Sequence, residues 1–399
     1  MSRVSFITLA FLSFMLLLTG CFSNRSKQDR YVVVLSLDGF RTEYTQRANT
    51  PTLDSLERVG VTSTFRPCYP SVTFPNHYSM ATGLHPDHHG LVNNFFYDRA
   101  ADSVYRMGNL DPQFYGGEPI WNTAERQGVR TASFYWVGSE VPLASGQPSI
   151  WKKFDKRVPY IDRADSVVSW LKLPERERPH LIMWYIEEPD GIGHSATPDS
   201  SATIEMIERL DGVLNHFFTE ARKLDIFEYI DFIVLSDHGM ATYYPEKYVN
   251  LNDYLPRDSF DYVFDGVPTL LYPKESYIDS AYAKLKEVPN ITVWKKGEIP
   301  DRFVYGKNPR VSELVVAPNI GTYVQFRSES RPRYAATHGY DNFTPEMGAI
   351  FYAAGPSFKK NIKVPEMANV NLYLMIARLL NIEPAANDGE EAVVNQLFK

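Results

Sequence analysis

Three hydrophobic runs of strand length each lead directly into acidic or imidazole side chains. The runs are Tyr31–Leu37, Leu181–Ile186 and Phe232–Leu235, and the polar residues after them are Asp38, Asp190 with His194, and Asp237 with His238. Continuous apolar runs are typical of strands buried on both faces of a parallel sheet. Because the carboxyl ends of parallel strands share one edge, where such sheets bind ligands, we expect these side chains to gather there.

Stretches with apolar residues at three-and-four spacing lie between the runs and are typical of amphipathic helices. They are Pro51–Gly60, Pro119–Gly128, Ala202–Lys223 and Glu366–Leu380. The alternation predicts an α/β fold with a mostly parallel central sheet flanked by helices on both faces. Residues 254–333 are rich in Tyr, Pro and short β-like runs, so we expect a small, less regular insertion there that forms a capping subdomain.

The composition fits one large globular domain, which we place at residues 31–399. The chain has 399 residues, of which 44% are hydrophobic, enough for a sizeable core. The net charge of −7 is mild, and no polybasic run is present. We therefore expect no nucleic-acid binding.

The first twenty residues predict a lipoprotein signal peptide. Arg3 precedes an apolar run over residues 6–18 that is short for a membrane span. The sequence Leu18-Thr19-Gly20-Cys21 resembles a bacterial lipobox, in which the cysteine carries the lipid. We expect Cys21 to anchor the protein through a polar tether, residues 21–30, in the cell envelope, and in its outer membrane because Phe22 rather than Asp follows the cysteine. An ordinary signal peptide is the alternative.

A nucleophile candidate stands in the segment from Tyr69 to Gly83. Thr73 is placed to open a helix, where its hydroxyl can reach a metal ion and backbone N–H groups can meet an anion. A simple helix cap is the alternative. Asp and His donors, with His338 late in the chain, suit Zn²⁺ and similar ions. Asp190 and His194 are four residues apart, so on one helical turn they face one ion together.

Six ordered motifs together resemble the nucleotide pyrophosphatase/phosphodiesterase family of the alkaline phosphatase superfamily. They are Leu37-Asp38-Gly39, Pro70-Ser71-Val72-Thr73-Phe74-Pro75-Asn76-His77, Gly90-Leu91-Val92-Asn93-Asn94, Glu188-Pro189-Asp190-Gly191-Ile192-Gly193-His194, Ser236-Asp237-His238-Gly239-Met240 and Thr337-His338-Gly339. The resemblance runs from Tyr31 to the C-terminal helix. It implies an enzyme that cleaves phosphodiester or pyrophosphate bonds of nucleotides and releases nucleoside 5′-monophosphates.

The resemblance also implies two Zn²⁺ ions and the residues that hold them. One ion would be held by Asp190, His194 and His338, and the other by Asp38, Asp237, His238 and the Thr73 oxygen. Thr73 would attack phosphorus in line and form a covalent phosphothreonyl intermediate, which water then hydrolyses. Asn94 would donate a hydrogen bond to a phosphoryl oxygen, as an oxyanion-hole group does.

The same resemblance places three aromatic residues, Phe74, Phe154 and Tyr185, at the nucleotide base. Phe154 stands where the family carries Tyr, and a phenyl ring can stack on a base equally well. Ordinary core packing is the alternative reading of Tyr185. A small-molecule nucleotide or another phosphodiester is thus the expected substrate.

Several alternatives stay open at this point. They are a choline-type or lipid phosphodiesterase, a phosphomonoesterase or phosphonate hydrolase of the same superfamily, and a non-catalytic zinc-binding surface lipoprotein. The segment Cys68-Tyr69-Pro70 begins like a sulfatase motif, but Val72 stands where that motif requires Arg.

Four histidines follow Thr73 closely: His77, His85, His88 and His89. None of them matches a ligand of the family. We expect His77 and His89 to be structural, and an additional metal site among the four is the less favoured reading, because a ligand set must converge in space.

Overall fold

The computed structural model describes residues 30–326 and 335–399. The predicted signal peptide, Cys21 and nearly all of the tether lie outside the described residues, so the lipid anchor stays a prediction. Within the two described ranges, no helix combines the length and the apolar character needed to cross a bilayer.

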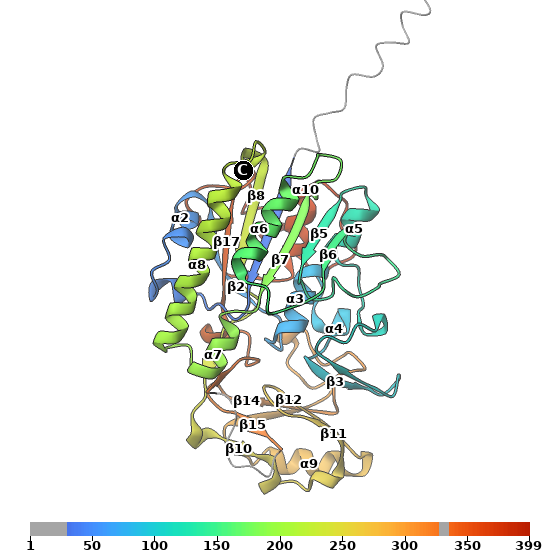
Figure 1. Ribbon diagram of the computed structural model, residues 1–399. Helices are drawn as coiled ribbons and strands as arrows, with labels where there is room; N and C mark the ends of the chain where they lie inside the picture. Colours follow the sequence, from blue (N-terminus) through green and yellow to red (C-terminus); the bar gives the residue numbers. More distant parts are fainter. Residues whose placement is uncertain (1–29, 327–334) are drawn as a thin grey trace, which may run out of the picture.

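A nine-stranded sheet forms the centre of the molecule (Figure 1). Its strands, in spatial order, are β18 (Ile362–Lys363), β2 (Val61–Arg66), β17 (Ala349–Ala354), β8 (Ile230–Leu235), β1 (Tyr31–Leu37), β7 (Leu181–Ile186), β5 (Thr131–Phe134) and β6 (Ile150–Lys152), with β19 (Met367–Ala368) also beside β2. Strand β1 runs parallel to both β7 and β8, whereas β17 runs antiparallel to both of its neighbours. The predicted mostly parallel sheet is therefore confirmed.

Helices cover both faces of this sheet. One face packs on α2 (Pro51–Val59), α6 (Tyr160–Leu171) and α8 (Ser201–Ala221), and the other on α3 (Thr73–Thr82), α5 (Ile120–Arg126), α10 (Asn371–Leu380) and α11 (Glu391–Val394). Strand β1 supplies Val33 and Leu35 to the first core and Val32 and Val34 to the second. Side chains alternate between faces along a strand, so burial on both faces explains why β1 is an unbroken apolar run.

The fourth predicted helix, Glu366–Leu380, is wrong at its start. Helix α10 begins only at Asn371. Met367 and Ala368 instead pair in parallel with Phe65 and Arg66 of β2. The first residues of that stretch therefore form a short strand beside β2 rather than the first turn of the helix.

A second sheet lies below the central one in Figure 1. It contains β11 (Phe260–Phe264), β12 (Thr269–Pro273), β14 (Leu314–Pro318) and β13 (Ile291–Lys295) in that antiparallel order, with α9 (Ile278–Leu285) packed on it. These elements fall within the predicted insertion, which is more regular than its sequence indicated. The second sheet, α9 and the segments that connect them form a lower lobe, which includes Phe303 between β13 and β14. The ring centroids of Tyr69 and Phe303 are 4.5 Å apart, so this lobe packs against the segment before Thr73.

Short elements complete the fold. They are three strand pairs, β3 (Phe95–Asp98) with β4 (Ser103–Arg106), β9 (Ala241–Thr242) with β16 (Ala336–Thr337) and β10 (Val249–Asn250) with β15 (Val324–Gln325), and two short helices, α4 (Pro86–His89) and α7 (Asp190–Ala196).

Candidate metal centre and active site

The carboxyl ends of three adjacent strands carry the predicted acidic and imidazole residues. Asp38 follows β1, Asp237 and His238 follow β8, and α7 begins at Asp190 a few residues after β7. Since β1 pairs with both β7 and β8, these ends meet at one edge of the sheet. Thr73 is the first residue of α3 and lies at the same edge.

The first group of donors consists of Asp190, His194 and His338. The Nε2 atom of His194 lies 3.4 Å from one carboxylate oxygen of Asp190, and the Nε2 atom of His338 lies 3.4 Å from the other. Asp190 and His194 share one turn of α7, as their spacing predicts. His338 arrives on the loop after β16.

The second group of donors surrounds His238. Its Nε2 atom lies 3.4 Å from Asp38 Oδ1, 3.1 Å from Asp237 Oδ2 and 3.2 Å from the Thr73 hydroxyl oxygen. The rings of His238 and His338 stack with their centroids 3.7 Å apart, so the two groups are adjacent.

Backbone carbonyls hold all three imidazoles by the same nitrogen. The Nδ1 atoms donate to the carbonyls of Ala336, Gly239 and Ser71, at 2.8 Å from His194, 2.8 Å from His238 and 2.9 Å from His338. A proton on Nδ1 leaves the Nε2 lone pair directed into the centre. This arrangement is typical of histidine ligands, whose second nitrogen is fixed by a hydrogen bond.

Three carboxylate oxygens of the centre are buried and accept no hydrogen bond from the described residues. They are Asp38 Oδ1, Asp190 Oδ1 and Asp237 Oδ2. A buried oxygen without a partner is costly, and a bound cation removes that cost. Carboxylate and imidazole donors in this number suit Zn²⁺, so the residues present fit a pair of such ions.

The pKa shifts of the carboxylates and imidazoles in the centre also agree with a site for cations. Burial, followed by the charges of Asp237 and Asp190, raises the pKa of Asp38 well above its usual range. Burial, followed by His238 and His194, lowers the pKa of His338 well below its usual range and keeps its imidazole neutral, the form that binds metals.

Two residues behind the ligands were not recognised from the sequence as parts of this centre. The Tyr185 hydroxyl donates to Asp38 Oδ2 at 2.6 Å, so this side chain, whose predicted contact with a base stays a prediction, also holds a carboxylate. His77 Nδ1 lies 3.2 Å from Asp237 Oδ2, and its Nε2 lies 2.9 Å from the Ser36 hydroxyl. The spacing of His77 four residues after Thr73, on the same helix face, is the signal that could have revealed it.

Gly39 lets the chain turn between the strand and the centre. It has a φ of +68°, and a Cβ there would lie 3.0 Å from the Asp190 Cα. Its N–H donates to Asp237 Oδ1 at 3.2 Å. Glycine is thus required both by the conformation and by the close approach of Asp190.

The predicted substrate residues lie around Thr73 and Tyr185. Asn94 Oδ1 accepts a hydrogen bond from the Phe74 N–H at 3.0 Å, which fixes the amide beside the start of α3. The Phe74 ring is half-buried, whereas Phe154 is 45% exposed with its ring centroid 6.3 Å from that of Tyr185. An exposed aromatic ring therefore stands near the donors.

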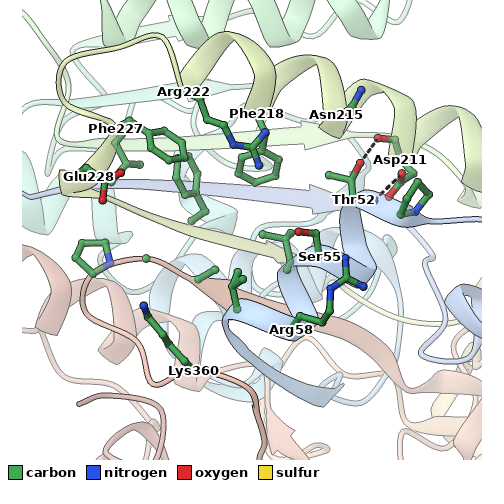
Figure 2. A pocket seen from close by; sticks show the side chains of 18 of the residues that line it. Thr52, Ser55, Arg58, Asp211, Asn215, Phe218, Arg222, Phe227, Glu228 and Lys360 are labelled. Carbon is green, nitrogen blue, oxygen red and sulfur yellow. Dashed lines mark hydrogen bonds between the residues drawn. The ribbon is translucent and has the colours of Figure 1, made fainter.

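A cavity of about 990 Å³ lies elsewhere, between α2 and α8 (Figure 2). Ile230 and Phe232 line it, so it opens at the amino end of β8, away from Asp237. Thr52 and Asp211 are hydrogen-bonded to each other in its wall. It contains none of the seven donors.

Comparison with known families decides the identity of this arrangement. A sequence profile of the type I phosphodiesterase/nucleotide pyrophosphatase family matches residues 32–341. The chain belongs to this family. The resemblance drawn from the six motifs is thereby confirmed, and the family consists of hydrolases that act on phosphodiester bonds.

Curated relatives match almost the whole chain. Human ectonucleotide pyrophosphatase/phosphodiesterase family member 1 is 35% identical over 385 residues, which is 92% of this chain and 42% of that protein. An uncharacterized pyrophosphatase/phosphodiesterase of Schizosaccharomyces pombe is 34% identical over 379 residues, 90% of this chain and 78% of that protein. The chain thus spans less than half the length of the mammalian relative.

Solved structures of the family share the fold. Human ectonucleotide pyrophosphatase/phosphodiesterase 5 superimposes with a TM-score of 0.89 at 30% identity, over 92% of this chain and all of that one. The murine protein, in an inactive threonine-to-alanine form in complex with AMP, gives the same score and identity over 93% of this chain and all of that one. The predicted alkaline phosphatase-like architecture is confirmed.

Proposed function

We propose that this protein is a zinc-dependent phosphodiesterase that cleaves nucleotides and releases nucleoside 5′-monophosphates. The observation that carries the proposal is the position of Thr73. Thr73 opens α3, and its hydroxyl lies 3.2 Å from His238, beside six further metal donors, in a chain that belongs to a family of phosphodiester hydrolases.

The donors divide between two ions as the motifs suggest. Asp190, His194 and His338 would hold one, and Asp38, Asp237, His238 and Thr73 the other. Zinc bound there would lower the pKa of the threonine hydroxyl and balance the charge of the phosphate.

Thr73 and Asn94 then carry out the chemistry together with the start of α3. The Thr73 oxygen forms a bond to phosphorus while the bond from phosphorus to the leaving oxygen breaks on the opposite side. The Asn94 NH2 group donates to a phosphoryl oxygen, while its Oδ1 stays bonded to the Phe74 N–H at the start of α3. Water then displaces the threonine oxygen from phosphorus, which frees the nucleoside monophosphate and restores Thr73.

The expected substrate is a nucleotide with a second group on its phosphate. The AMP complex of the murine relative supports a nucleoside monophosphate moiety in the site. In this chain Phe154 is exposed near the donors and offers a face for a base, and Phe74 lies beside the nucleophile.

Initial rates on p-nitrophenyl thymidine monophosphate and on p-nitrophenyl phosphate test the proposal. We expect a strong preference for the diester. Thr73→Ala should lower the rate at least about 10³-fold, as loss of a nucleophile does, while Thr73→Ser retains part of it. A preference for the monoester would assign the protein to the phosphomonoesterases. A Thr73→Ala variant with full activity would refute the assignment of Thr73 as the nucleophile.

A further inference from the structure

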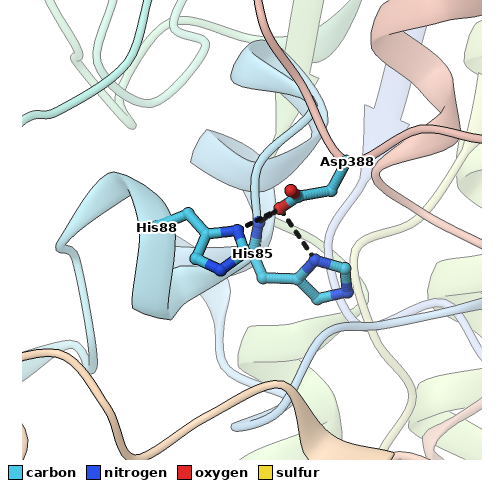
Figure 3. Close-up of side chains that lie close together, drawn as sticks. All are labelled: His85, His88 and Asp388. Carbon is cyan, nitrogen blue, oxygen red and sulfur yellow. Dashed lines mark hydrogen bonds and ion pairs between the residues drawn. The ribbon is translucent and has the colours of Figure 1, made fainter.

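A second cluster of side chains that could hold a metal ion follows the C-terminal end of α3, and Figure 3 shows its three members. It consists of His85, His88 and Asp388. The Nδ1 atom of His85 lies 3.0 Å from Asp388 Oδ2, and that of His88 lies 2.6 Å from the same oxygen. One carboxylate therefore faces two imidazole nitrogens, although Asp388 is about 300 residues later in the sequence.

The backbone holds this cluster in place. The Asp388 N–H donates to the Gly83 carbonyl at 2.7 Å, and the His85 N–H donates to Asp388 Oδ2 at 2.8 Å. His85 directly precedes α4 and His88 lies within its single turn, where the His88 N–H donates to the His85 carbonyl. The donors are thus brought together by fixed chain segments.

The cluster is open to solvent on one side. The side chain of His88 is 48% exposed, and those of His85 and Asp388 are 19% and 22% exposed. An ion can reach such a site, and water can complete its coordination. Two imidazoles and one carboxylate are a donor set that suits Zn²⁺, Ni²⁺ and Cu²⁺.

We propose that His85, His88 and Asp388 form a third site for a divalent transition-metal ion. Ligands around such an ion stand about 3.3 Å apart, given bonds of about 2.0 Å in a tetrahedron. A small outward movement of the exposed His88 ring meets that spacing. With the proton of each imidazole on Nε2, both Nδ1 lone pairs face the ion.

This site is separate from the proposed catalytic centre. Thr73 begins α3 and the cluster follows its C-terminal end, and ten residues of helix span about 15 Å. An ion here links the end of the nucleophile helix to the segment after α10. Its effect is therefore mechanical: it fixes the C-terminal segment to α3 and adds no group to the reaction.

Metal content measures the proposal directly. The full chain and its His88→Ala and Asp388→Asn variants are dialysed against the same zinc concentration, and bound zinc per chain is counted by elemental analysis. We expect each variant to hold one ion fewer than the wild type. Because the result is a difference, it does not depend on how many ions the catalytic centre holds.

His216→Ala is the matched control. His216 Nε2 also lies 2.7 Å from an aspartate oxygen, that of Asp165, and is partly exposed, but this pair is not part of any three-donor cluster of the described residues. The control should keep the wild-type zinc content. Equal content in the wild type and the His88→Ala variant would overturn the proposal, as would the same loss in the control.

Thermal unfolding supplies a second readout. Added zinc at a hundred times its dissociation constant for the third site should raise the Tm of the wild type by about 3 °C, given the stabilisation expected from mass action and the size of the chain. The His88→Ala and Asp388→Asn variants should lack this increment, whereas His216→Ala should retain it. An increment of the same size in all four proteins would refute a site at this cluster.

Discussion

The orientation of the Asp38 carboxylate depends on a neighbouring side chain that is not one of the seven candidate donors. The Tyr185 hydroxyl occupies one of its carboxylate oxygens, and this leaves the other oxygen directed at His238. His77 lies beside a second carboxylate: its Nδ1 is hydrogen-bonded to the Thr73 carbonyl at 3.0 Å and lies 3.2 Å from Asp237 Oδ2. Groups of this kind fix the orientation of ligands and sustain metal affinity.

Tyr185→Phe removes only that hydroxyl. We expect kcat/KM to fall about 10- to 100-fold and zinc affinity to fall with it, the usual cost of losing such a partner. Tyr44→Phe is the control, because the Tyr44 hydroxyl is also buried but has no hydrogen-bond partner among the described residues. Zinc titration and initial rates measure both variants. Equal losses in the two would show that the hydrogen bond to Asp38 has no specific role.

His89 predicts a pH dependence of stability. Burial, followed by His85, lowers its pKa from 6.5 to about 3, and it is held by the Ser79 hydroxyl. Below pH 6.5 the His89 imidazole binds a proton in the unfolded chain but stays neutral in the folded chain. The stability that this neutral imidazole contributes is therefore complete above pH 6.5 and is lost as the pH falls toward 3.

His89→Gln should weaken that dependence. The difference in free energy of unfolding between wild type and variant should shrink as the pH is lowered from 6.5 toward 3, because only the wild type loses this contribution. Denaturant titrations at several pH values measure it. A difference that is constant over this range would contradict the lowered pKa.

Between elements, the critical contact joins the His338 loop to the lower lobe. Gly339 has a φ of +101°, and a Cβ there would lie 1.8 Å from the carbonyl oxygen of Val267, just before β12. The lobe and the metal-ligand loop thus touch without space for any side chain. Packing of Tyr69 on Phe303 joins the same lobe to the segment before Thr73.

Gly339→Ala should therefore disturb the centre as well as the fold. We expect the free energy of unfolding to fall by about 2 kcal/mol more than in a control, the size typical of overpacking, together with a lower zinc content. Gly297→Ala is that control, because Gly297 has a φ of +83° but nothing within 4 Å of the added Cβ. Equal destabilisation in both variants would attribute the effect to backbone conformation alone.

The sequence predicted best those elements in which every residue is buried in the same kind of surroundings. Strands β1 and β7 are buried on both faces and have the predicted bounds, because an unbroken apolar run has no competing interpretation. The start of α10 was missed because Met367 is apolar in either state and only pairing with β2 decides between them. The positions of Tyr185 and His77 depend on contacts with Asp38 and Asp237 from other strands, which no local pattern encodes.

For the whole molecule, the negative charge of the centre predicts that stability depends on bound metal. Asp38 and Asp237 are buried and Asp190 is partly buried beside them, so their mutual repulsion opposes folding unless a cation is present. Chelation with EDTA should abolish activity and lower the Tm by several degrees, and Zn²⁺ should restore both.

The Thr73→Ala variant separates the two effects. It should be inactive yet still gain thermal stability from Zn²⁺, because six donors remain. Elemental analysis confirms that the ions have been removed and replaced. Full activity in protein stripped of metal would refute the zinc-dependent mechanism.

The loop that carries His338 makes one of the contacts with the largest sequence separation in the described residues. Its imidazole is held by the carbonyl of Ser71, 267 residues earlier. Contacts between such distant segments give the fold a high contact order, and chain entropy must be overcome before they add stability. Local helices and neighbouring strands can form first, whereas the first donor group is complete only after nearly the whole polypeptide has been made and has folded back on its beginning. A nascent or truncated chain that ends before this loop lacks His338. Metal binding by the complete first group would therefore report that this loop has folded back onto the segment around Ser71.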